Sequence, residues 1–234
     1  MRKNQIKFHD HKRDQEKEVF KTKSNFFVMN LIHARALVLI LPFLISACGK
    51  NYTPEQKEHI AKVELQRKEK NEYMKSSQDS PFNFKGKVEF HDLKYFDIDP
   101  GYVFKSKLYE YQPKDTVTIY GTKGEPRKVV RYGYVLFNYN STEYKINVYE
   151  GKTRDNVIYH SIWFTDKTTN NESYGVGRYI DFEKKDDANY IYEIDFNAAY
   201  NPYCAYSPKY SCAIPTKEDY IPVEIKAGEK KFHE

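Results

Sequence analysis

The sequence lacks an apolar run long enough to cross a bilayer as a helix. Its apolar stretch over residues 36–47 is about a dozen residues long, whereas a spanning helix needs about 20. It has 3 cysteines, no internal repeat and no Ser-His-Asp pattern. From residue 48 onward its only histidines are His59, His91, His160 and His233, none of which are at the spacing of paired metal ligands. Two glycines, Gly175 and Gly177, are too few for a phosphate-binding loop and precede a strand-like stretch. These absences predict no metal, no cofactor and no catalytic signature.

The end of the apolar stretch carries a more specific signal. Residues 44–48 read Leu-Ile-Ser-Ala-Cys, and Arg35 and His33 precede the stretch. This pattern is typical of a signal peptide, and its end resembles the lipobox, after which Cys48 is lipidated and becomes the new N-terminus. Acyl chains then hold the protein to a membrane without a spanning helix. The alternative is a plain cysteine in a core helix.

The extreme N-terminus fits a signal peptide poorly, because residues 1–28 are polar and highly charged. We therefore expect translation to start at Met29. The chain then divides into a leader and signal peptide (1–47), a lipidated N-terminus with a charged helix (48–80) and a β-rich domain (81–234). Gly49 is not followed by an acidic run, which is typical of lipoproteins of the outer membrane. We expect a cell-envelope protein anchored there and facing the periplasm.

The charge distribution argues against nucleic acid as a partner. The full chain has a net charge of +5, with 38 Lys and Arg against 33 Asp and Glu. Residues 1–47 carry 9 of the basic and 4 of the acidic residues, so 29 of each remain from Cys48 onward. A basic surface is the electrostatic footprint of nucleic-acid binding. Here the excess belongs to the segment that we expect to be removed.

One helix and a series of short strands are predicted. Thr53, Pro54 and Gln56 form a capping-box start, and the helix should run to about Lys75, as a solvated helix or, less expected, as a partner-binding one. Tyr, Val, Ile and Phe at alternating positions favour strands. The expected strands cover residues 102–111, 117–120, 129–139, 144–149, 157–164, 174–182, 190–196 and 222–226, with a hairpin turn at 121–124. The fold class is therefore mainly β (α+β), an antiparallel sandwich or open barrel with one N-terminal helix.

Three blocks in the last third combine glycine, aromatic and charged residues. They cover residues 172–181, 195–212 and 225–230. In this order they resemble an uncharacterised bacterial and archaeal family, the domain of unknown function numbered 1684, whose members carry Tyr-Gly-x-Gly-Arg-Tyr, Asp-Phe-Asn-x-Ala-Tyr-Asn-Pro-x-Cys-Ala-Tyr and Ala-Gly-Glu-Lys. Weaker matches at 80–82, 93–97 and 164–168 extend the resemblance over residues 55–230. The departures are Ile180 and residues 213–215. The resemblance implies membership without an activity.

The polar residues of these blocks are the candidate site. Aspartate and asparagine side chains at strand ends commonly satisfy turn backbone, which is the structural interpretation. In the functional interpretation an arginine paired with a carboxylate orients an anionic or peptide-like group. The candidates for binding are Glu172, Tyr174, Arg178, Asp195, Asn197, Tyr200, Asn201, Tyr206 and Glu229.

Cys204 and Cys212 form an even pair with seven residues between them. In an envelope compartment such a pair predicts a disulfide. A zinc site and a catalytic thiolate at Cys204 are the alternatives, the second needing His91 or His160 as a base.

Two functions remain open. The first is a lipid-anchored, non-catalytic module that binds an unknown small molecule or peptide, or serves a structural role. The second is a hydrolase or transferase with Glu172, Asp195 or Glu229 as its base, which would require an acid with a raised pKa in a cleft.

Overall fold

The computed structural model describes residues 50–84, 87–153 and 155–233. The predicted signal peptide, Met29 and Cys48 lie outside these residues. Among the described residues, no helix is both long and apolar enough to cross a membrane.

Helix α1 (Pro54–Ser76) begins as the sequence predicts. The Thr53 side chain accepts a hydrogen bond from the Gln56 N–H, and the Gln56 side chain accepts one from the Thr53 N–H. Only Val63 and Met74 of this helix are buried. Because so little of α1 is apolar, most of its attachment to the domain is polar.

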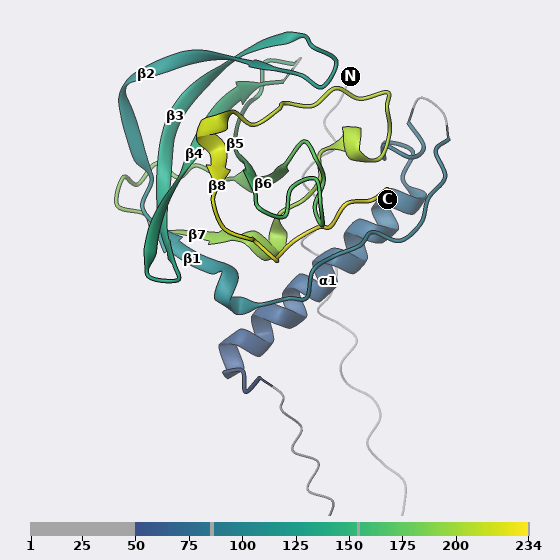
Figure 1. Cartoon of the computed structure of the whole chain (residues 1–234), viewed down its shortest axis with the longest axis horizontal. Coiled ribbons are helices and arrows are strands. Elements are labelled where there is room, and N and C mark those ends of the chain that lie inside the picture. The colour runs from purple at the N-terminus through teal and green to yellow at the C-terminus, as the bar shows by residue number, and fades with distance from the viewer. Residues whose placement is uncertain (1–49, 85–86, 154, 234) are drawn as a thin grey trace, which may run out of the picture. The chain divides into compact units, whose positions relative to one another are not determined.

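The main sheet is antiparallel and curls into a half-barrel (Figure 1). Its strand order is β2 (Tyr109–Tyr120), β3 (Pro126–Tyr139), β4 (Thr142–Lys152), β5 (Ile158–Asp166) and β6 (Arg178–Phe182). A short strand, β8 (Tyr220–Ile221), pairs in parallel with the end of β5. The predicted mainly β fold with one N-terminal helix is confirmed.

The inner face of the half-barrel carries the main core. It consists of alternate residues of the strands, such as Val135, Phe137, Ile146, Val148 and Ile162, which are almost completely buried. A smaller cluster around Tyr149 and Trp163 lies on the outer face, and a third, around Met74 and Phe82, lies against α1.

Some predicted strands differ from the structure. Residues 102–111 do not form one strand. Tyr102 ends the 3-10 turn η1 (Pro100–Tyr102), and the rest divides between β1 (Val103–Ser106) and the start of β2. Strand β1 pairs with β7 (Tyr192–Asp195), about 90 residues away in the sequence. Residues 174–177 form a turn, closed by the Gly177 N–H donating to the Tyr174 carbonyl (3.0 Å).

The C-terminal stretch was expected to close the sheet over residues 222–226, and this expectation is wrong. Residues 223–231, which we call the C-terminal segment, belong to no strand, and Glu229 forms an isolated bridge with Tyr95. Their backbone groups bond instead to buried side chains and to residues 93–99, which we call the strap. Figure 1 shows the chain after α1 running back alongside the helix before it enters β1.

Candidate functional site: a groove between the helix and the strap

Helix α1 reaches the domain through long polar side chains. Arg67 donates to the carbonyl oxygens of Phe96 (2.8 Å) and Asn197 (3.4 Å), and its guanidinium lies 4.4 Å from the centre of the Tyr95 ring. Asn71 accepts a hydrogen bond from the Leu93 N–H (3.0 Å). These bonds hold the helix alongside the strap but leave a gap between the two segments.

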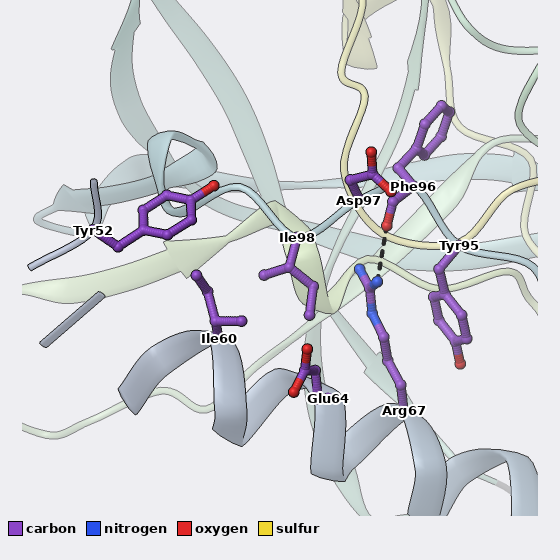
Figure 2. Close-up of a pocket in the computed structure, with 8 residues that line it drawn as sticks. All are labelled: Tyr52, Ile60, Glu64, Arg67, Tyr95, Phe96, Asp97 and Ile98. Carbon is purple, nitrogen blue, oxygen red and sulfur yellow. Dashed lines mark hydrogen bonds between the residues drawn. The ribbon is translucent and has the colours of Figure 1, made fainter. Parts of the chain in front are cut away.

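That gap is an open groove of about 460 Å³ (Figure 2). Ile60, Ile98 and Tyr52 make one end apolar, and Arg67 crosses the other end to reach the strap. The full lining consists of Tyr52, Ile60, Glu64, Arg67, Tyr95, Phe96, Asp97 and Ile98. Such a combination of apolar surface with a few placed charges is common to sites for small molecules and peptides.

The groove contains one polar group with unused bonding capacity. Burial lowers the pKa of Arg67 despite the nearby anionic groups, and its Nε–H is buried without a hydrogen-bond partner. A buried donor without a partner costs roughly 1–3 kcal/mol. The charged guanidinium of Arg67 belongs to the lining of the groove, so a ligand carboxylate bound there would lie close to a positive charge.

Beneath the strap lies the carboxylate of Glu229, which is 1% exposed. Its Oε1 is 2.6 Å from the Lys70 Nζ and 3.5 Å from the Tyr95 hydroxyl. Its Oε2 accepts hydrogen bonds from the Asn201 N–H (2.8 Å) and the Tyr206 hydroxyl. Burial and the Glu229 charge raise the pKa of both tyrosines. Glu229 thus ties α1, the strap and the second sequence block together.

Arg178 is equally buried, at 1% exposed, and serves the C-terminal segment. It donates to the carbonyl oxygens of Ile225 (2.8 Å), Ala227 and Glu229 (3.4 Å). It also pairs with Asp166 (3.2 Å). These three carbonyls belong to alternate residues and all point to the same guanidinium. Arg178 therefore supplies the donors that a neighbouring strand would otherwise supply.

Asp195 and Asn197 form a separate connection to the strap. Asp195 Oδ1 accepts from both nitrogens of Asn197, at 2.8 Å and 2.9 Å. Asn197 in turn exchanges two bonds of 2.9 Å with the backbone of Asp99. Strand β7 ends at Asp195, so Asn197 lies in the 3-10 turn η2 (Phe196–Ala198) and not on a continuation of the strand.

Glu172 and Tyr174 lie apart from these contacts. Glu172 pairs with Lys226 (3.1 Å) and Tyr174 donates to the carbonyl of Cys204 (3.2 Å). Tyr200 donates to Asp181 (2.6 Å), and the Lys70 Nζ lies 4.6 Å from its ring centre. Asn201 binds the carbonyl of Lys230 (2.7 Å) through its side chain. The candidate residues therefore support the strap and its surroundings, and none of them lines the groove itself.

The predicted disulfide is not formed. Cys204 and Cys212 are free thiols, and the Cys212 sulfur accepts a hydrogen bond from the Cys204 N–H (3.1 Å). The loop between them is held by other bonds. Thr122, in the β2–β3 turn, donates its N–H to the Cys212 carbonyl (2.9 Å) and accepts from the Cys212 N–H (3.2 Å). A cross-link is therefore not needed to fix this loop.

The residues that line the groove were not found from the sequence. Arg67 and Ile60 occur in a helix so rich in charge that nothing distinguishes them from its solvated positions. Tyr95 and Phe96 fall in the weak family match at 93–97, and that match was the one signal for the strap. Asp166 likewise falls in the weak match at 164–168.

The fold and the groove define a β-rich domain with a helix-and-strap edge. Residues 88–230, more than half of the chain, match the family described as protein of unknown function (DUF1684), and the chain belongs to this family. A solution NMR structure of an uncharacterised protein from gene locus rrnAC0354 of Haloarcula marismortui has a similar fold. The match has a TM-score of 0.55 and 24% identity, and covers 75% of this chain and 96% of that one. Comparison with curated proteins finds no match.

Proposed function

We propose that this protein is a lipid-anchored binding module of the cell envelope that holds a small ligand or short peptide in the groove without catalysis. The observation that carries the proposal is Arg67, whose buried Nε–H has no partner beside the apolar side chains of Ile60 and Ile98. A ligand that offers both a carboxylate and an apolar group complements this arrangement.

The anchor rests on the lipobox-like sequence that ends at Cys48. Tyr52, which lines the groove, follows Cys48 by four residues in the sequence. The binding site is therefore built on the first described element after the proposed anchor. We place the protein on the outer membrane, facing the periplasm, because no acidic run follows Gly49.

The carboxylate-base alternative has less support. Glu229 is enclosed by four partners, Glu172 is paired with Lys226, and Asp195 caps η2 and lies 3.3 Å from His59. A general base must reach the proton that it removes. These three carboxylates are engaged in holding the domain together, and none of them faces the groove.

Radiolabelled palmitate tests the anchor. We expect incorporation in cells that express the full chain and none in the Cys48→Ser variant, which should be released from the membrane fraction. A Cys204→Ser variant serves as the control and should be labelled like the parent. Equal labelling of the Cys48→Ser variant, or a parent protein found free in the cytosol, would remove the anchor from the proposal.

Peptide titration tests the groove. The probes are N-acetylated dipeptides that end in Leu or Phe, each as a free acid and as an amide, and the measurement is calorimetric. We expect the acids to bind more tightly than the amides in the parent, and this preference to disappear in Arg67→Met. Arg131→Met, on β3, is the matched control and should bind like the parent. Binding of neither form, or an unchanged preference in Arg67→Met, would contradict the groove as the site.

A further inference from the structure

One face of α1 brings an apolar, an acidic and a basic side chain into the groove. Ile60, Glu64 and Arg67 all line it, and their spacing of four and three residues places them one after another along the same face of the helix. Figure 2 shows Glu64 projecting towards the strap between the other two side chains. A ligand lying along the helix would therefore meet an apolar group, a negative charge and a positive charge in that order.

Neither of the two charges is neutralised by an ion pair within the described part of the chain. The terminal nitrogens of Arg67 donate to the carbonyl oxygens of Phe96 (2.8 Å) and Asn197 (3.4 Å), which are uncharged partners. Glu64 is exposed, and its carboxylate has no hydrogen bond or ion pair with any residue in 50–84, 87–153 or 155–233. The groove therefore keeps a cation and an anion apart, three residues from each other.

The strap adds a second negative charge and no positive one to the lining. Asp97 is exposed, and with Glu64 it makes two acidic residues in the lining against the single basic residue Arg67. A ligand that is only an anion would be attracted by one of these groups and repelled by two, because like charges across an interface disfavour binding. A ligand that carries an ammonium group as well as a carboxylate complements the whole set.

We propose that the ligand of the groove is a free α-amino acid with a large apolar side chain, an inference that rests on the binding function proposed above. Its carboxylate lies beside Arg67 and its ammonium group beside Glu64. Its side chain packs at the apolar end, which is formed by Tyr52, Ile60 and Ile98. The α-carbon of such a ligand carries all three groups, and the groove presents a complement to each of them.

The closeness of the two charges favours an amino acid over a peptide. Side chains three residues apart on a helix have Cβ atoms about 5–6 Å from each other, so Glu64 and Arg67 can reach groups on a single α-carbon. A peptide places its ammonium group and its carboxylate on different residues, and an internal stretch of peptide has neither. Charge-assisted hydrogen bonds at both groups would fix the orientation of the ligand.

The test is calorimetric titration of the full chain with leucine, N-acetyl-leucine and 4-methylpentanoic acid, which is leucine without its amino group. We expect leucine to bind roughly 10-fold or more tightly than the other two acids, the usual gain from a hydrogen bond between charged groups. This preference should disappear in Glu64→Gln, which should still bind 4-methylpentanoic acid as the parent does. Glu69→Gln is the matched control, because Glu69 is exposed on the same helix outside the groove lining, and it should bind leucine like the parent.

The outcomes separate this inference from the proposed function. If N-acetyl-leucine and 4-methylpentanoic acid bind but leucine gains nothing, or if Glu64→Gln keeps the gain, the groove remains a carboxylate site and the amino-acid assignment is wrong. Tighter binding of glycyl-leucine than of leucine would assign the groove to peptides and also overturn the inference. Binding of none of these probes would overturn both. Thermal unfolding of Glu64→Gln should match the parent, so that a lost preference reports on the ligand and not on folding.

Discussion

Arg178 shows how one side chain can replace a strand. Its guanidinium bonds to three carbonyls of the C-terminal segment and to Asp166, whose side chain is fully buried. Burial lowers the pKa of Arg178, and the charge of Asp166 opposes this effect. Arginine suits this position because its planar fork carries five donors, whereas lysine offers a single point charge.

We therefore expect Arg178→Met to lower the free energy of unfolding by about 3–5 kcal/mol, since it leaves Asp166 buried and unpaired. Arg178→Lys should also be strongly destabilising, because an ammonium group carries its three donors on one atom and cannot span three carbonyls and the Asp166 carboxylate. Urea unfolding followed by circular dichroism measures both. Arg131→Met provides the comparison, because its partner Glu218 is 61% exposed and such pairs contribute only about 0–1 kcal/mol. Equal losses at the two arginines would contradict this role for Arg178.

Gly228 is required for a different reason. Its φ is +78°, and a Cβ atom there would lie 2.5 Å from the Ala199 carbonyl oxygen. Gly124, in the β2–β3 turn, has a similar φ of +82° but nothing within 4 Å of such an atom. The two positions separate backbone strain from close packing.

Gly124→Ala should lower the free energy of unfolding by about 1–2 kcal/mol through the left-handed conformation alone. Gly228→Ala carries the same strain and also displaces packed backbone, which adds roughly 1–3 kcal/mol. Thermal unfolding of the two variants side by side measures the difference. If the two alanine variants lost the same stability, the close approach of Gly228 to Ala199 would not matter.

At the scale of elements, local signals were sufficient for α1 and for the β2–β3 hairpin. The capping box at Thr53 and the turn at residues 121–124 each depend on neighbours in sequence, and both are present in the structure. Strand β7 was nearly correct in extent, but its partner β1 was not identifiable. Alternation shows that a strand has two faces and does not show which distant strand it joins.

The β4–β5 pair carries a half-buried histidine whose titration makes stability depend on pH. His160 on β5 lies directly across from Glu150 on β4, with its Nε2 3.4 Å from the carboxylate. Burial lowers the pKa of His160, chiefly against the opposing attraction of Glu150. The other charged groups that act on it are Lys184 and, on β2, Glu110. The Tyr132 ring of β3 packs edge-on against its ring, and Lys114 lies over that same tyrosine.

A histidine with a lowered pKa in the folded state favours folding above its unfolded value of about 6.5. Below that pH the unfolded chain takes up the proton more readily, so stability falls as the pH falls. We expect the free energy of unfolding to decrease from pH 7.5 to pH 5.5, and to decrease less in His160→Gln. The remaining histidines are common to both proteins. The same slope in the variant and in the parent would show that His160 is not the source.

At the scale of the whole domain, the three sequence blocks do meet, but on a buried layer. Arg178, Asn201 and Glu229 come from different blocks, and each is 1% exposed. The sequence predicted that these polar residues act together, because they are clustered in the three blocks that carry the family resemblance. It did not predict that they face inward, since burial depends on the strap and on α1, which are more than 70 residues away.

One of the links between α1 and the rest of the domain is a charge pair whose carboxylate is buried. Lys70 and Glu229 are 2.6 Å apart, with side chains 27% and 2% exposed. Removing one member leaves the other charge uncompensated, whereas removing both does not. The two single changes and the double change therefore have different consequences for the groove and for stability.

We expect Lys70→Met alone to lower the free energy of unfolding by about 3 kcal/mol, because Glu229 then keeps only neutral partners. Adding Glu229→Gln to Lys70→Met should recover a large part of this loss, giving a coupling energy of roughly 1–3 kcal/mol in the double-mutant cycle. Urea unfolding of all four proteins measures the cycle. Lys68→Met, on the same helix, is the control and should be close to neutral. Additive losses would show that the helix is held by Arg67 and Asn71 and that the buried carboxylate belongs to the domain alone.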